Sequence, residues 1–73
     1  MYTYNAEVTD LFGGDANYSW VRRYEIKAKN FRGAINKLAR IYGSGWRLTT
    51  YCGNYQQYKM TGACITCFIT EGE

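Results

Sequence analysis

Three cysteines are the residues of this chain best suited to chemistry, and two of them form the pattern Cys64-Ile65-Thr66-Cys67. A C-x-x-C pair binds zinc or exchanges disulfides only when its two sulfurs converge. The alternation around this pattern predicts a strand, on which residues three apart point to opposite faces. A structural zinc site also takes four ligands, and Cys52 is the only other cysteine. We therefore expect no metal and interpret the cysteines as small buried thiols.

Groups for acid–base catalysis are scarce. The chain has no histidine, which removes the usual general base and the commonest metal ligand. Its six carboxylates are scattered along the sequence. Two of them are expected to form cross-strand surface ion pairs, with Glu7 and Glu25 opposite Arg23 or Lys27. We expect a protein that is not an enzyme and that uses no cofactor.

Length and composition predict one compact domain over residues 1–73. Apolar residues make up 47% of the chain, enough for a core in a domain of this size. No apolar run approaches the ~20 residues of a membrane span. The first ten residues alternate and are polar, unlike a signal peptide, and an odd number of cysteines does not close a disulfide framework. These features predict a soluble protein of the reducing cytoplasm.

The hydrophobic period changes at Asn30. Before this residue the apolar side chains alternate, as on a strand. After it, apolar residues recur at the spacings of one helix face: Phe31, Ala34, Ile35, Leu38, Ala39 and Tyr42. The other face carries Arg32, Asn36 and Arg40. Asn30 is a suitable N-cap and Gly43 a favoured residue at the C-terminal end. We predict a helix between them that is apolar inside and basic outside.

Alternating segments surround this helix. They predict strands over Tyr2–Thr9, Tyr18–Ala28, Trp46–Cys52, Tyr55–Met60 and Ala63–Thr70. Leu11–Asn17 is predicted to be a connection longer than a tight hairpin turn. On the second strand, Tyr18 and Trp20 are expected to share a face with Tyr24. Ala63–Thr70 is apolar on both sides, which is typical of a central strand.

The expected fold class is α+β. One helix lies on one face of an antiparallel sheet of four to five strands, in the order ββαβββ, or ββαββ if Tyr55–Met60 stays irregular. The sheet face away from the helix is expected to be partly open and to carry much of the tyrosine, arginine and lysine. Glycines and turn residues at Gly53-Asn54 and Thr61-Gly62 are expected to connect the last three strands.

Basic residues give the one positive functional signal. The net charge is +3, and most of the nine lysines and arginines fall in the middle third of the chain. Arginine suits bidentate contact with carboxylate or phosphate, and tyrosine is a favoured contact residue. The residues that we expect to contact a partner are Arg22, Arg23, Arg32, Arg40, Tyr51 and Tyr55. The competing interpretation of these charges is an ordinary solvated surface.

In its strand–cap–helix unit over Tyr24–Tyr42, its short aromatic strands and its length, the chain resembles small phage-encoded proteins that block host defence, the anti-CRISPR proteins in particular. The resemblance is one of architecture and carries over no functional residue. It implies a non-catalytic inhibitor, from a phage or mobile element, that occludes a host defence protein or a ribonucleoprotein. The alternative is a module that binds nucleic acid directly with the same basic surface. A third possibility is self-association through strand edges, and the oligomeric state stays open.

Overall fold

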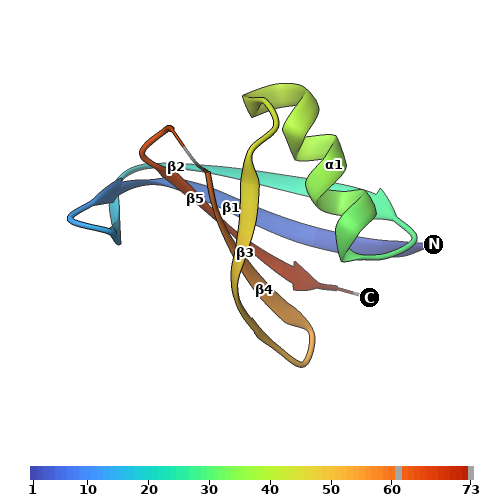
Figure 1. The fold of residues 1–73 in the computed structure, drawn as a ribbon. Coiled ribbons are helices and arrows are strands. Elements are labelled where there is room, and N and C mark those ends of the chain that lie inside the picture. Colours follow the sequence, from blue (N-terminus) through green and yellow to red (C-terminus); the bar gives the residue numbers. More distant parts are fainter. Residues whose placement is uncertain (61, 73) are drawn as a thin grey trace.

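The computed structural model describes residues 1–60 and 62–72, and these residues form one helix and a five-stranded antiparallel sheet (Figure 1). The elements are β1 (Tyr2–Phe12), β2 (Asp15–Ala28), α1 (Phe31–Tyr42), β3 (Trp46–Cys52), β4 (Tyr55–Met60) and β5 (Ile65–Glu71). The strand order is β2-β1-β5-β4-β3. This confirms the α+β class, the ββαβββ order and the central place of the last strand. No helix in the described part is long and apolar enough to cross a membrane.

The helix begins and ends where the sequence predicts. Asn30 Oδ1 accepts a hydrogen bond from the Gly33 backbone N–H at 2.8 Å, which satisfies one of the free amides of the first turn. Gly43 follows the last helical residue with a φ of 104°, a conformation that favours glycine. Leu38 is fully buried and Arg40 is exposed, so the predicted orientation of the helix is confirmed.

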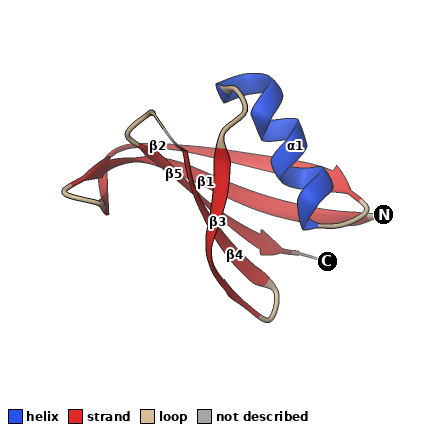
Figure 2. Ribbon diagram, in the orientation of Figure 1, coloured by secondary structure: helices blue, strands red, loops and turns tan. Residues whose placement is uncertain are grey.

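The hydrophobic core lies between the helix and one face of the sheet (Figure 2). Its buried members are Tyr4, Ala6, Val8, Ile26, Ala28, Ala34, Ile35, Leu38, Tyr58, Cys67 and Ile69. The Tyr4 and Phe31 rings pack with their centroids 4.9 Å apart. Gly33 allows a close approach between α1 and the end of β2, since a Cβ there would lie 3.2 Å from the Ala28 Cβ. Burial on this face is what holds a twelve-residue helix in place.

The β1–β2 connection is a tight turn, so the prediction of a long connection over Leu11–Asn17 is wrong. Phe12 pairs with Asp15, which leaves only Gly13 and Gly14 between the strands. Both glycines have positive φ, 65° and 87°, as a type I′ hairpin turn requires. β1 and β2 therefore continue through most of the segment that was predicted to be a connection, up to the two glycines.

An irregularity in β2 changes the direction of its side chains. The β1–β2 register shifts between Thr9, which pairs with Val21, and Leu11, which pairs with Ala16. Several β2 residues therefore lie opposite Asp10 alone. Tyr18 is in this segment with a φ of 58°, and its ring stacks on Phe68 of β5. The prediction that Tyr18 shares a face with Tyr24 is wrong, because the bulge interrupts the strict alternation on which it depended.

Two of the three cysteines are exposed, which corrects their interpretation as buried thiols. β5 begins at Ile65, so Ala63 and Cys64 lie in the exposed connection before it and not in the strand. Cys52 ends the edge strand β3, next to the Gly53-Asn54 turn, where no further element covers it. Cys67 alone is buried. The turn predicted at Thr61-Gly62 falls partly outside the described residues, because Thr61 is not among them.

Candidate protein-binding groove

The six residues expected to contact a partner lie in separate regions of the molecule. Arg23 and Tyr55 are on the sheet face away from the helix, as their strand pairings show. Arg32 and Arg40 are on the outer face of α1. Tyr51 is 73% exposed on the edge strand β3. Arg22 is on the helix side of β2, so these residues do not form one contact surface.

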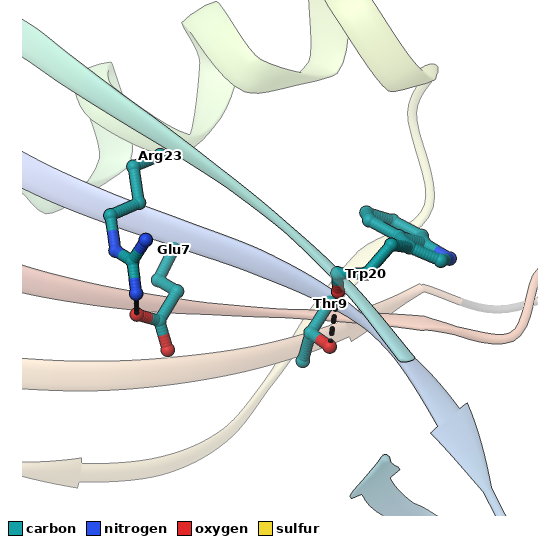
Figure 3. A network of polar contacts seen from close by, with 4 residues as sticks. All are labelled: Glu7, Thr9, Trp20 and Arg23. Carbon is teal, nitrogen blue, oxygen red and sulfur yellow. Dashed lines mark hydrogen bonds and ion pairs between the residues drawn. The ribbon is translucent and has the colours of Figure 1, made fainter. Parts of the chain in front are cut away.

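Arg23 is engaged within the chain. It pairs with Glu7 in the β1–β2 register, and Arg23 Nη2 lies 3.2 Å from Glu7 Oε2 (Figure 3). This confirms one of the predicted cross-strand ion pairs. The Arg23 side chain is 74% exposed, so the pair is solvated and contributes about 0 to 1 kcal/mol to stability.

The sheet face away from the helix is partly open, as predicted, and partly covered by other parts of the chain. The tip of the β1–β2 hairpin folds over it, and Lys59 Nζ of β4 donates to the Gly14 carbonyl oxygen at 2.8 Å. Tyr18 and Tyr55 both stack with Phe68, with ring centroids 6.4 and 6.2 Å from it. Beneath the bulge Thr9 is fully buried, and its hydroxyl donates to the Trp20 carbonyl oxygen at 2.8 Å (Figure 3). Burial also raises the pKa of Tyr55.

The outer face of α1 carries three basic residues and no acidic one. Arg32, Lys37 and Arg40 are all exposed, and the helix sequence contains no acidic residue. Lys37 Nζ donates to the backbone carbonyl oxygen of Lys27, which ties the middle of the helix to the end of β2. The guanidinium groups of Arg32 and Arg40 are left to solvent, so this face presents positive charge without an acidic neighbour on the same helix.

A groove between the C-terminal half of α1 and β2 combines apolar, aromatic and basic side chains. We call it the α1–β2 groove, and its lining residues are Trp20, Arg22, Tyr24, Ile41 and Tyr42. Its volume is about 540 Å³. Ile41 is 57% exposed and Trp20 is 39% exposed, so the groove presents apolar area to solvent beside Arg22. None of the lining residues is acidic.

The floor of the groove is held rigid by two tyrosines. The Tyr24 and Tyr42 hydroxyl oxygens lie 2.7 Å apart in a hydrogen bond, and their rings meet edge to face. Tyr42 also packs edge to face on Trp46 at the start of β3. Burial, together with the hydrogen bond to Tyr24, raises the pKa of Tyr42 to about 12. The Tyr42 hydroxyl is therefore neutral at physiological pH, and its hydrogen bond to Tyr24 links the helix to the sheet.

Ile41 and Tyr42 were not among the predicted contact residues. The sequence did hold a signal for Ile41, since it is a large apolar residue outside the helical stripe that packs on the sheet. Tyr42 was expected only in the core. Trp20 was expected on the same strand face as Tyr24, but nothing in the sequence placed it beside the end of the helix.

The groove is concave and combines apolar area with a positive charge, and these properties suit the binding of a partner molecule. In the described residues no group of three or more histidine, cysteine or acidic side chains is placed to hold a metal ion. No protein-family model, curated protein or solved structure matches the chain. The functional argument therefore depends on the geometry of the groove and of the basic helix.

Proposed function

We propose that this chain is a non-catalytic binding protein that covers an anionic site on a larger protein or nucleoprotein with its α1–β2 groove. The observation that supports this most strongly is that Trp20 and Ile41, two large exposed apolar side chains, line the same groove as Arg22. Tryptophan, tyrosine and arginine are the residue types most enriched at the energetic centres of protein interfaces. Arg40, next to Ile41 on the helix, extends the positive charge outward from the groove.

A protein surface suits this arrangement better than a single nucleic-acid strand does. Binding to single strands combines a basic groove with a row of aromatic rings on which bases stack. Here the row formed by Tyr18, Phe68 and Tyr55 lies on the sheet face opposite the basic helix. On the helix side, Tyr24 and Tyr42 are committed to each other. The groove is therefore suited to receive an apolar side chain flanked by carboxylates.

We further propose that the protein is an inhibitor from a phage or mobile element that acts in the cytoplasm of a host cell on a defence complex. Its small size and its resemblance to anti-CRISPR proteins in architecture support this proposal. Inhibition by occlusion needs a rigid surface and no catalytic group. The groove has a fixed part of this kind, because two of its aromatic side chains, Tyr24 and Tyr42, pack against the core.

The test is a nuclease assay with purified CRISPR effector complexes of several types, to which the purified protein is added. We expect inhibition of at least one complex. Trp20→Ala and Arg22→Glu should each abolish that inhibition. Arg47→Glu makes the same charge change on β3, away from the groove, and should leave inhibition intact. If no complex is inhibited, the anti-defence proposal is wrong. If inhibition persists in both groove variants, the groove is not the contact surface.

A second candidate, direct binding of nucleic acid, is favoured by the acid-free outer face of α1. Arg32, Lys37 and Arg40 could contact the phosphates of a duplex without stacking on bases. Gel retardation with duplex DNA and RNA over a series of salt concentrations distinguishes the two functions. Phosphate binding should weaken steeply with salt and should be reduced by Arg40→Glu more than by Trp20→Ala. An absence of retardation at low salt excludes this candidate.

A further inference from the structure

The outer edge of β2 is an unpaired strand edge. β2 has β1 on one side and, among the described residues, no strand on the other. Gly72 N–H donates to the Thr3 carbonyl oxygen at 2.7 Å, so the backbone groups of Thr3 point away from β2. Thr3 pairs with Lys27, whose own carbonyl accepts from the Lys37 side chain and not from β1. The Thr3–Lys27 pair is therefore one that is not hydrogen-bonded across the two strands.

Hydrogen-bonded and non-hydrogen-bonded pairs alternate along an antiparallel ladder. Arg23 and Glu25 lie four and two residues before Lys27 on the same strand. Their backbone N–H and C=O groups therefore point in the same direction as those of Lys27, to the outer edge of β2. Both residues are exposed. Glu25 forms no ion pair among the described residues, and Arg23 contacts only Glu7. The middle of the β2 edge thus presents free backbone groups flanked by one positive and one negative side chain.

We propose that this edge pairs with the β2 edge of a second copy of the chain. The two strands run antiparallel about a two-fold axis at Tyr24, so that Arg23 of each copy lies opposite Glu25 of the other. Each of these pairs exchanges both of its backbone hydrogen bonds. Opposite charges directly across a sheet are stabilising, and a two-fold interface must be complementary to itself. The sequence Arg23-Tyr24-Glu25 satisfies that requirement.

Neighbouring registers are disfavoured. A shift of two residues in one direction places Arg23 opposite Arg23, and the same shift in the other direction places Glu25 opposite Glu25. Like charges directly across a sheet are destabilising. A further shift would make the Glu25–Lys27 pairs the central ones, but Lys37 already bonds the Lys27 carbonyl that both of these pairs need. In the proposed register Lys27 lies opposite Val21, at the end of the paired stretch, so the central pairs do not use that carbonyl. The charges of Arg23 and Glu25 and the hydrogen bond from Lys37 to the Lys27 carbonyl therefore favour one alignment. Charged side chains on an edge strand limit unwanted pairing in this way.

The dimer would bring the two α1–β2 grooves together. A two-fold axis perpendicular to the sheet keeps both helices on the same face of a continuous sheet. The groove residues Trp20, Arg22 and Tyr24 would then line both sides of the axis. This inference does not depend on the proposed function, because a monomer could use one groove alone.

The test is sedimentation of two single-charge variants, separately and mixed. The wild-type chain should shift from monomer toward dimer as its concentration rises through the micromolar range. Arg23→Glu and Glu25→Arg should each sediment as a monomer, because each places like charges across the axis. Their equimolar mixture should recover the dimer mass, because each variant then faces the opposite charge. Arg40→Glu, a charge reversal on the outer helix face, is the control and should dimerise like the wild type.

Near-ultraviolet circular dichroism of each variant checks that the aromatic core is intact. The loss of the Glu7 contact in Arg23→Glu cannot explain a recovered dimer, because that loss is also present in the mixture. A wild-type chain that stays monomeric to millimolar concentration would overturn the proposal. So would two folded variants that remain monomeric when mixed, or that dimerise on their own.

Discussion

The Asp10 carboxylate accepts a hydrogen bond from the Ser19 hydroxyl at 2.6 Å and another from the Ser19 backbone N–H at 2.9 Å. Asn17 Nδ2 adds a third at 3.0 Å. One side chain of β1 thereby replaces the ladder bonds that the bulged segment of β2 lacks. The bulge directs Tyr18 onto Phe68 and leaves Trp20 at the α1–β2 groove. The hydrogen bonds of Asp10 therefore hold the bulge that places Tyr18 on one face of the sheet and Trp20 on the other.

Replacing this carboxylate should change how stability depends on pH. The hydrogen bond from the Ser19 hydroxyl, followed by that from Asn17, holds the pKa of Asp10 well below its usual range. A depressed pKa in the folded state stabilises the protein above the unfolded value, near pH 4, and that stability is lost as the pH falls below it. Asp10→Asn should thus be less stable than wild type at neutral pH, with a smaller difference near pH 2. Urea unfolding at both pH values measures this, and an unchanged difference would contradict it.

Leu38 should matter far more to stability than Arg40. Leu38 is completely buried between α1 and the sheet, so Leu38→Ala removes packing and leaves a cavity. We expect a loss of about 2 to 5 kcal/mol in the free energy of unfolding. Arg40→Ala, on the exposed face, should change it by less than about 0.5 kcal/mol. Urea titrations of the two variants decide the matter, and equal losses would mean that the helix faces the other way.

The periodicity of the sequence was enough to predict the helix, its N-cap and the order of the elements along the chain. The apolar stripe from Phe31 to Tyr42 can be buried only if these residues form a helix with that stripe against the sheet, and Asn30 marks where the helix begins. The bulge was not predictable in the same way, because it depends on Asp10 reaching Ser19, a contact between two strands. The predicted contact residues do not lie together for a related reason. Arg22 and Arg23 are adjacent in sequence, yet neighbouring residues of a strand point to opposite faces.

At position 18, glycine should give a more stable protein than alanine, which is the reverse of the usual order within a strand. Its positive φ costs a non-glycine residue about 1 to 2 kcal/mol, and the stack on Phe68 offsets that cost. Tyr18→Ala loses the ring and keeps the backbone cost. Tyr18→Gly loses the ring and removes the cost, so it should be the more stable variant by about 1 kcal/mol. Thermal unfolding compares the two, and a more stable alanine variant would show that the backbone conformation is not the cause.

The three cysteines should differ in reactivity. Cys52 and Cys64 are exposed, whereas Cys67 is buried in the core, and burial raises the pKa of its thiol to about 12. A thiol reagent at pH 8 should therefore modify the first two rapidly and leave Cys67 unmodified. Mass spectrometry of peptides after labelling identifies each site. Cys67 should become reactive only in denaturant, and rapid labelling in buffer would place it outside the core.

The pairing of β1 with β5 has a consequence for how the chain folds during synthesis. These strands come from opposite ends of the sequence and lie side by side near the middle of the sheet. When only β1, β2 and α1 have emerged from the ribosome, the nascent chain has a hairpin and a helix but lacks the core residues Cys67 and Ile69. The central ladder can close only after translation has reached β5, and contacts so distant in sequence make folding comparatively slow. A chain stalled on the ribosome before this point would expose the inner edge of β1 to other polypeptides.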